Sequence, residues 1–302
     1  MIASVTLTRN DWHCLEQWAA FYHEYVSALA WHVVVDNAST PEYRRKLGEL
    51  FPQSVHLHRE TNGGTTGAYN TGISWILENH PEVDAILLIA NDIRISASDI
   101  GKLYARLEKD SSLGAVAPVL LDGKKDKIVA YGERLRNDFG LDRLHDGEPF
   151  APEKLPPEQP SECLPGGICM VKTEVYRKIG LQDESLFMYF DENDFFYRTM
   201  QAGYALVTLR DAVAAHCHIV TEGKGNDSGL AWFYINRNHL LLCRKYRGLA
   251  EFLLLWLKKA FFIGFKYCLG FLLREHSLKK VFYYQLGIVC GVLGIRRNFV
   301  RK

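Results

Sequence analysis

The chain lacks the cysteine pattern and the leader segment that would assign it to an exported class of protein. Its seven cysteines among 302 residues are scattered, odd in number and never spaced as C-x-x-C. This excludes a disulfide framework and a zinc ribbon, and a reducing cytosol is the expected setting. The first residues, MIASVTLTRND, show neither a basic and apolar leader nor a cleavage site. We therefore expect no secretory signal.

A strong net charge is also missing, because 36 Lys and Arg stand against 35 Asp and Glu. The charges are unevenly distributed: from Arg244 onward there are 13 basic residues and only two acids, Glu251 and Glu275. The rest of the chain is therefore acidic. An acidic body with a basic, apolar tail predicts no nucleic-acid partner and favours contact of the tail with an anionic surface.

Short β-rich runs alternate with helical segments along the first third of the chain. This alternation predicts an α/β fold with a mostly parallel, Rossmann-like sheet flanked by helices. A continuously apolar strand, AILLIA, fits burial on both faces of such a sheet. The expected strands are residues 2–7, 32–35, 55–58 and 85–90, and the expected helices are residues 14–25, 43–51 and 71–79.

Two later segments need separate interpretations. Residues 122–162 are rich in Asp, Gly, Lys and Pro, and we expect them to form a long, irregular loop with a functional or mobile role. The globular body should end near Arg247, which gives a catalytic domain over residues 1–247 and a helical tail over 248–302.

The tail is apolar but is too often interrupted to span a membrane. Lys258, Lys259 and Lys266 break it into runs shorter than the roughly 18 to 20 residues that a span needs. On a regular helix these lysines share one face with Glu251, which leaves an apolar face that includes Phe252, Leu254, Trp256, Phe261 and Phe265. This pattern predicts an amphipathic helix at a membrane surface. The alternative is packing on the body or on a second subunit, so homo-oligomerisation stays open.

Polar residues that could perform chemistry follow the buried strands. Asp36 and Asp92 each come directly after an apolar strand, where the ligand crevice of an open α/β sheet lies. The segment FMYFDENDFFYR places three acids among aromatic rings, an environment that makes carboxylates candidate bases near neutral pH. An oxygen from Asp92 and a nitrogen from His216 or His218 would suit Mg²⁺ or Mn²⁺ holding a diphosphate.

The glycine-rich segment NGGTTGAYNTG leads into a helix and would let a nucleotide approach the backbone. It is neither a P-loop nor a dinucleotide-binding fingerprint. The chain also lacks G-x-S-x-G and H-E-x-x-H motifs, so serine hydrolase and zinc protease functions have no support.

Eight segments in the same order resemble glycosyltransferase family two, the inverting enzymes of GT-A fold, and within it the rhamnosyltransferase-like branch of bacterial surface-polysaccharide assembly. They cover residues 3–247 and read TLTRND, VVVDNAST, NGGTTGAYNTGI, LLIAND, PGGICMVKTEVYRKIG, LFMYFDENDFFYRTMQAGY, DAVAAHCH and FYINRNHLLLCRKY. The resemblance implies transfer of a sugar from a UDP- or dTDP-sugar, with Mg²⁺ or Mn²⁺, to a lipid-linked glycan for O-antigen or capsule. It also implies a cytoplasmic enzyme, peripheral on the inner face of the plasma membrane.

The resemblance also implies a role for individual residues. Glu192 would be the general base, with Asp191 as the other candidate. Asp92 would bind the metal with His216, and His218 is the rival to that histidine. The donor nucleotide would contact Thr8, Arg9, Asp36, Asn62, Gly67, Asn70 and Asn91, and the donor sugar or acceptor would lie near Gly166, Gly167, Asp194 and Arg198.

Two positions depart from the family pattern. The element that usually has two metal-facing acids reads Ala90-Asn91-Asp92, so one carboxylate is missing. The base pair reads Asp-Glu where Glu-Asp is usual. The sequence therefore leaves two other functions open, a catalytically silent sugar-nucleotide or membrane-surface binding module and a nucleotidyltransferase that would hold a triphosphate on Arg9 and Arg59.

Overall fold

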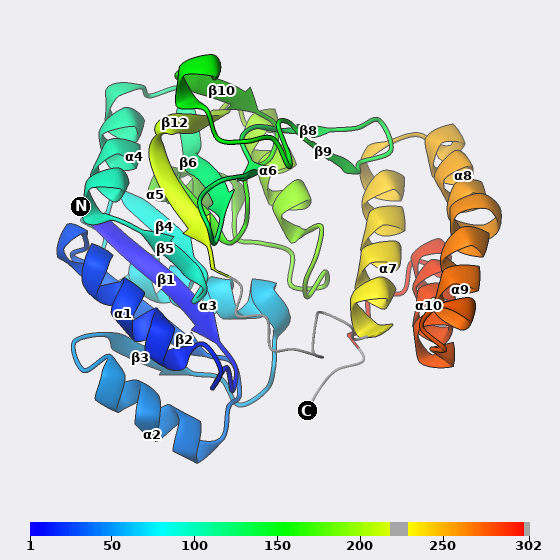
Figure 1. The fold of residues 1–302 in the computed structure, drawn as a ribbon, viewed down its shortest axis with the longest axis horizontal. Coiled ribbons are helices and arrows are strands. Elements are labelled where there is room, and N and C mark those ends of the chain that lie inside the picture. Colours follow the sequence, from blue (N-terminus) through cyan, green and yellow to red (C-terminus); the bar gives the residue numbers. More distant parts are fainter. Residues whose placement is uncertain (218–228, 299–302) are drawn as a thin grey trace.

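The computed structural model describes residues 1–217 and 229–298 (Figure 1). Its first half alternates strands and helices, as the sequence predicts. The elements are β1 (Ile2–Thr8), α1 (Leu15–Tyr25), η1 (Val26–Ala28), β2 (Trp31–Asp36), α2 (Pro41–Leu50), β3 (Val55–His58), α3 (Gly64–Asn79), β4 (Ala85–Ile89), β5 (Ile93–Ile95), α4 (Ala97–Lys109) and β6 (Leu113–Asp122).

The second half adds short strands and then a run of helices. The elements are β7 (Ile128–Ala130), β8 (Glu133–Leu135), β9 (Leu141–Arg143), η2 (Pro152–Lys154), β10 (Glu158–Ser161), β11 (Ile168–Lys172), α5 (Thr173–Ile179), α6 (Asp191–Gln201), β12 (Ala205–His216), α7 (Gly229–Tyr246), α8 (Leu249–Leu257), a π-helical turn η3 (Lys258–Phe262), α9 (Ile263–Leu273) and α10 (Leu278–Leu293).

The main sheet of the described residues has the strand order β10-β12-β6-β11-β4-β1-β2-β3. Strands β1 to β4 are mutually parallel, and β11 is inserted antiparallel between β4 and β6. The sheet is therefore mostly parallel in its first half. The strand order reverses between β1 and β4, because β2 and β3 follow on one side of β1 while β4 lies on the other. Ligands of open α/β sheets bind at such a reversal, beyond the carboxyl ends of the strands.

Helices cover both faces of this sheet, which explains why its strands are apolar on both sides. One core packs α1, α2 and α4 on the sheet, with Trp18, Tyr43 and Leu103 among its buried residues. The other core packs α3, α5 and α6, with Ile73 and Phe195. Both layers are visible in Figure 1.

Helix α3 is longer than the sequence predicts. We expected a helix over residues 71–79, but the helix begins at Gly64. The side chain of Asn62 accepts a hydrogen bond from the Gly64 backbone N–H at 2.9 Å, which satisfies a donor that the first turn leaves free. The glycine-rich motif is therefore mostly helical.

The excursion over residues 122–162 is more regular than predicted. It forms four short strands and a single 3₁₀ turn, and β8 and β9 pair as a separate hairpin. Figure 1 shows this hairpin reaching over the body towards α7. Contacts fix it there, because His239 of α7 hydrogen-bonds the Asp138 carbonyl at 2.7 Å.

The C-terminal helices pack on α7 and keep a second face in solvent. Leu240 of α7 shares a core with Phe252, Phe271 and Ile288. Gly287 of α10 allows close packing, since a Cβ at that position would lie 2.5 Å from a backbone oxygen of α7. The packing alternative for the tail is therefore correct for this face.

Two tail residues differ from the faces that a regular helix predicts for them. Phe252, expected on the outer apolar face, is buried, and Lys259, expected on the polar face, is 8% exposed and donates to Asn236 at 2.9 Å. The π-helical turn changes the angular spacing at Lys259, so a wheel drawn at 100° per residue fails there. No helix in the described parts of the chain combines the length and apolar content needed to cross a bilayer.

Candidate active site

The predicted donor residues begin where β1 and β2 end side by side. Thr8 and Asp36 are the last residues of these strands and are register partners. The Thr8 hydroxyl donates to the carboxylate of Asp11 at 3.1 Å, and Asn91 donates to the same oxygen at 2.9 Å. Asp11 therefore joins the end of β1 to the loop after β4. Sequence reasoning missed it, although it ends the matched segment TLTRND.

Asp36 is buried and forms an ion pair with an arginine side chain. The Arg44 guanidinium donates to its carboxylate at 2.6 Å, and the Ser39 backbone N–H donates to the other oxygen at 3.1 Å. The site at β2 therefore contains an ion pair in place of a lone acid. Arg9, on the loop beyond β1, is exposed.

The glycine-rich motif surrounds a second arginine. Arg59 donates to the Gly67 carbonyl at 2.8 Å, and its guanidinium lies 2.5 Å from the position that a Cβ on Gly63 would take. The amide of Asn62 pairs with Asn37 at 2.9 Å. Asn62 and Gly67 thus lie at one corner beside the carboxyl end of β2.

Asn70 has a structural role in place of the predicted donor contact. Its amide nitrogen donates to the Gln182 carbonyl at 2.9 Å and its oxygen accepts from the Gln182 backbone N–H at 3.1 Å. Both ends of the side chain are used, so Asn70 ties α3 to the loop before α6.

Asp92 and His216 meet as predicted. The antiparallel pairing of β5 with β12 sets His216 opposite Ile93, and His216 Nε2 lies 3.1 Å from Asp92 Oδ2. Both side chains are about one quarter exposed. His218 lies outside the described residues.

This pair fits part of a divalent-cation site. Neighbouring ligands of a Mg²⁺ or Mn²⁺ ion at about 2.1 Å lie about 3 Å apart, the separation seen here, and an oxygen and an imidazole suit these ions. The described residues contain no group of three or more metal-ligating side chains. The donor set therefore suits an ion that takes its remaining ligands from a diphosphate and water.

The predicted base residues lie beside the paired glycines. A Cβ on Gly166 would fall 2.1 Å from a carboxylate oxygen of Glu192, so only glycine lets this side chain lie there. The Gly167 carbonyl accepts a hydrogen bond from Ala90 at 2.8 Å. Because Ala90 is two residues before Asp92, the glycine pair connects the Glu192 side of the site with the metal side.

Asp191 is the more deeply buried member of the acid pair. It is 1% exposed, and neither carboxylate oxygen has a hydrogen-bond partner among the described residues. Burial, reinforced by the charge of Glu192, raises the pKa of Asp191 well above its usual value. Asp191 therefore tends to keep its proton, whereas Glu192 is only half-buried.

The loop before these acids is held in a strained conformation. Phe187, Tyr189 and Phe190 have φ values of 69°, 63° and 65°, the left-handed region that non-glycine residues avoid. Gly64 also has a left-handed φ of 69°, and a Cβ at this position would lie 2.1 Å from the Phe187 carbonyl oxygen, so only glycine fits there.

Helix α7 supplies the contacts that maintain this loop. Asn238 donates to the carbonyls of Leu186, Met188 and Tyr189 at 2.8 to 2.9 Å, and Arg237 donates to Ser185 at 2.7 Å. The signal for these residues was the matched segment FYINRNHLLLCRKY, but spacing alone did not reveal what they bind.

Asp194 and Arg198 differ from their predicted role near the sugar. Asp194 is fully buried, accepts from Lys245 at 2.8 Å and from Tyr246 at 2.7 Å, and is paired with Arg198 at 2.9 Å. These bonds join α6 to α7. The physical reason is that both carboxylate oxygens are already occupied, so no acceptor capacity faces the site.

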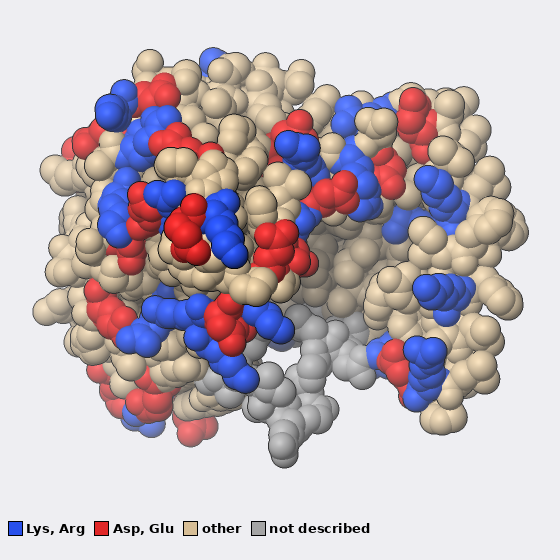
Figure 2. All heavy atoms as spheres, turned by 45° about the horizontal axis from the view of Figure 1, so that its top comes forward, with Lys and Arg blue, Asp and Glu red and all other residues tan. Residues whose placement is uncertain are grey.

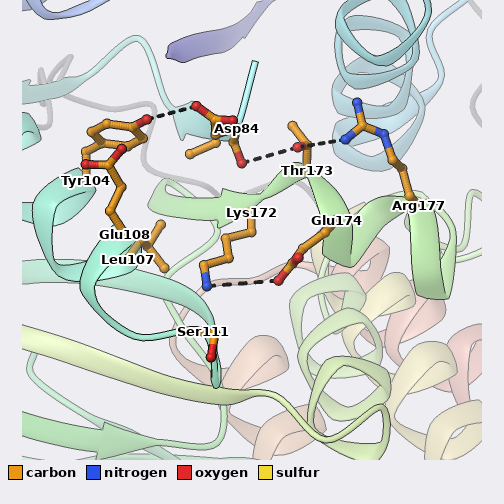
Figure 3. A pocket seen from close by; sticks show the side chains of 10 residues that line it. Asp84, Tyr104, Leu107, Glu108, Ser111, Lys172, Thr173, Glu174 and Arg177 are labelled. Atoms are coloured by element: carbon orange, nitrogen blue, oxygen red, sulfur yellow. Dashed lines mark hydrogen bonds and ion pairs between the residues drawn. The ribbon is translucent and has the colours of Figure 1, made fainter. Parts of the chain in front are cut away.

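A separate hollow of about 470 Å³ lies at the opposite end of β4 (Figure 3). It is lined by Asp84, Tyr104, Lys172 and Arg177, among others; Asp84 accepts a hydrogen bond from Tyr104, and Lys172 donates to the Asp110 carbonyl. Asp84 precedes β4 and Asp92 follows it, so this hollow is not part of the candidate active site.

Known proteins resemble this chain in sequence. Residues 30–179 match the model of the family described as Glycosyl transferase family 2. The low-salt glycan biosynthesis hexosyltransferase Agl10 of Haloferax volcanii is 28% identical over 204 residues, which cover 67% of this chain and 64% of that protein. The dTDP-rhamnosyl transferase RfbF of Shigella flexneri is 27% identical over 70% of each chain. An N-acetylglucosaminyl-diphospho-decaprenol L-rhamnosyltransferase of Mycobacterium tuberculosis is 26% identical over 66% of this chain and 70% of its own.

Solved structures show the same fold. The structure of GalNAc-T7 with UDP, GalNAc and Mn²⁺ has a TM-score of 0.60 at 16% identity and covers 78% of this chain and 47% of that one. The mannosyltransferase PcManGT of Pyrobaculum calidifontis, in complex with GDP-Man and Mn²⁺, has a TM-score of 0.55 at 13% identity and covers 97% and 87%. The predicted GT-A fold is confirmed.

Proposed function

We propose that this chain, which contains a glycosyl transferase family 2 domain, is an inverting glycosyltransferase that moves a sugar from a nucleoside-diphosphate sugar to a hydroxyl group of a glycan. The observation that carries this proposal is the arrangement around Gly166 and Gly167. One side of this glycine pair carries Glu192, and the other is bonded to the strand that ends at Asp92 and His216.

The donor would lie along the carboxyl edge of β1, β2 and β4. Thr8 and the ion pair of Asp36 with Arg44 would border the nucleoside, and Asn91 with Asp92 would face the diphosphate. A divalent cation held by Asp92 and His216 would offset the negative charge that develops on the departing diphosphate. Two of the relatives are rhamnosyltransferases, one of them a dTDP-rhamnosyl transferase, which supports a dTDP-sugar as donor, and a UDP-sugar is the second candidate.

Glu192 is the proposed general base. In an inverting transfer the acceptor oxygen bonds to the anomeric carbon while the bond from that carbon to the diphosphate breaks, and the hydroxyl proton must go to a nearby base. Glu192 is partly exposed beside Gly166, whereas Asp191 is buried and tends to stay protonated. Asp191 would then be the protonated member of the pair, which leaves the role of base to Glu192.

The catalytic proposal is tested with purified protein, a panel of UDP-, dTDP- and GDP-sugars, Mn²⁺ or Mg²⁺, and a short-chain N-acetylglucosaminyl diphospholipid as acceptor. Release of nucleoside diphosphate that depends on Glu192 supports it. Release of pyrophosphate would favour a nucleotidyltransferase, and nucleotide binding without turnover would favour a silent binding module.

The acceptor proposed here is lipid-linked, and the tail would hold the enzyme at the cytoplasmic face of the plasma membrane. The outer face of the tail exposes Phe261, Phe262 and Phe265 at 62%, 75% and 68%. Figure 2 shows the tail side as mostly uncharged surface with separate Lys and Arg side chains and a few acidic ones. Exposed aromatic rings beside basic residues suit an anionic interface.

The membrane proposal is tested by co-sedimentation with vesicles of phosphatidylglycerol and phosphatidylcholine. Deleting the tail would uncover the α7 face that Gly287 contacts, so point variants are preferable. Phe261→Glu with Phe265→Glu should abolish binding to anionic vesicles and preserve thermal stability. Lys109→Gln with Lys154→Gln, on exposed parts of the body, changes the net charge equally and should not affect binding.

A further inference from the structure

A third buried carboxylate, Glu133, lies near the proposed base and has no role in the site described above. It begins β8 in the excursion between β6 and β11 and is only 2% exposed. One oxygen accepts from Arg143 Nε at 3.2 Å. The other is buried, with only the weakly donating thiol of Cys163 as a neighbouring donor. A buried, half-satisfied acid is costly for the fold and calls for an explanation.

The backbone connects Glu133 to the segment that contacts Glu192. Glu133 forms an antiparallel bridge with Cys163, and its carbonyl accepts from Glu162 at 2.7 Å. Three residues after Cys163 the same segment reaches Gly166, over which the Glu192 carboxylate lies. Glu133 and Glu192 therefore both lie against the short segment 162–166, Glu133 at Glu162 and Cys163 and Glu192 at Gly166.

The groups around Glu133 come from β9, from α6 and from the segment between β10 and β11. Arg143 of β9 faces it with a positive charge, and Glu192 of α6 faces it with a negative one, while the Cys163 thiol is the third neighbour. The same two glutamates also act on the buried thiols of Cys163 and Cys169. Burial, opposed by Arg143 and reinforced by Glu192, raises the pKa of Glu133 to about 7.

We propose that Glu133 is a positioning residue for the transfer reaction, which acts through Glu192 by placing a second negative charge beside it, and that Arg143 controls when this charge is present. The inference rests on the proposed role of Glu192. When Glu133 is ionised, its negative charge favours movement of the acceptor hydroxyl proton towards the Glu192 carboxylate. When Glu133 is protonated, this effect is absent.

The first test measures the coupling without any substrate. Thermal stability of wild type and Glu133→Gln is compared between pH 4.5 and 8.5. An acid whose pKa is raised in the folded state lowers stability as pH rises from the unfolded pKa to the folded one. Wild type should therefore lose stability relative to Glu133→Gln up to about pH 7 and then run parallel. In a Glu192→Gln background this plateau should begin at lower pH, because the repelling charge is gone.

The second test is the pH dependence of kcat/KM, with whichever of dTDP-rhamnose, UDP-glucose or UDP-N-acetylglucosamine wild type turns over. Wild type and Glu133→Gln should be nearly equal at pH 6, where Gln resembles the protonated acid. At pH 8 Glu133→Gln should be slower by about three- to tenfold, because the charge that favours proton movement towards Glu192 is lost. A purely structural role would lower the rate equally at both pH values.

Two further variants sharpen the result. Arg143→Gln should raise the pH at which kcat/KM begins to exceed that of Glu133→Gln, because the cation that favours ionised Glu133 is lost. Asp142→Asn, on the same strand and exposed, pairs with Arg136 and should leave the profile unchanged.

The outcomes separate this inference from the proposed function. A stability plateau that Glu192→Gln does not move, or equal effects of Glu133→Gln at pH 6 and 8, overturns the role of Glu133 even if the enzyme transfers sugars. A moved plateau in a protein that turns over no nucleotide sugar supports the charge coupling and contradicts the glycosyltransferase proposal alone.

Discussion

The two sides of the candidate active site hold their acids in opposite ways. Asp92 is about one quarter exposed and lies 3.1 Å from His216, which is a natural partner for a cation. Asp191 is 1% exposed and has no partner among the described residues. The difference indicates that the Asp92 side favours a bound cation, whereas the Asp191 side favours a protonated carboxyl group. The glycine pair between them keeps these two environments adjacent but separate.

The largest effect should come from the acid pair of Asp191 and Glu192. Glu192→Gln removes the proposed base and should lower kcat by about 10²- to 10⁴-fold, the usual value of general-base assistance, without weakening nucleotide binding. Steady-state kinetics and calorimetric titration of the nucleotide check this. Glu174→Gln, an exposed glutamate on α5, is the matched control and should behave as wild type. A wild-type kcat for Glu192→Gln would contradict the role of Glu192 as the general base.

The Asp92 side should fail in a different way. Asp92→Asn keeps the shape but removes the charge that a cation needs, so kcat/KM should fall by about a hundredfold or more, corresponding to a few kcal/mol. Higher Mn²⁺ should restore part of the rate. Activity that does not change with Mn²⁺ in either protein would contradict a metal role for Asp92.

The support from α7 should matter for rate more than for binding. Asn238→Ala removes the donor that three loop carbonyls share, so the free energy of unfolding should fall by about 1–3 kcal/mol. Misplaced acids should also lower kcat by roughly tenfold. Asn236→Ala, on the same helix, removes hydrogen bonds to Trp232 and Lys259 and should leave kcat unchanged. Equal kcat losses in both variants would argue against loop positioning.

The last prediction concerns stability, with the smallest expected effect on rate. Asp191→Asn removes an acid whose folded pKa is raised, so wild type should lose stability as pH rises above the ordinary aspartate pKa, and the variant should not. Each pKa unit of the shift corresponds to about 1.4 kcal/mol. Thermal melts from pH 4 to 8 measure the difference. Parallel curves for the two proteins would mean that Asp191 ionises as freely as an exposed acid.

The sequence predicted best those features that follow from strand order. Periodicity located β1 to β4, and the placement of polar residues at strand ends predicted Asp36 and Asp92 at one edge of the sheet, while Thr8 came from the family resemblance. The partnership of Asp92 with His216, 124 residues apart, was predicted only through the family resemblance, since the sequence pattern alone left His216 and His218 open. The strand-end predictions succeed since the carboxyl ends of parallel strands must share one edge of the sheet.

The remaining features depend on tertiary contacts that no local pattern encodes. Asp194 resembled a site residue but is bonded to Lys245 and Tyr246 across two helices. Lys259 resembled a surface lysine until a π-helical turn directed it inward. Glu133 lies in a segment predicted to be irregular, and its burial depends on the hairpin fold of β8 and β9. Each miss reflects packing between elements that are distant in sequence.

The most direct measurement of the central claim is the stereochemistry and stoichiometry of the reaction, followed by proton NMR with purified protein, dTDP-rhamnose, Mn²⁺ and a short-chain N-acetylglucosaminyl diphospholipid. The proposed mechanism predicts one nucleoside diphosphate released for each sugar transferred, with the anomeric configuration of the product opposite to that of the donor. Retention of configuration, or release of pyrophosphate, would contradict it.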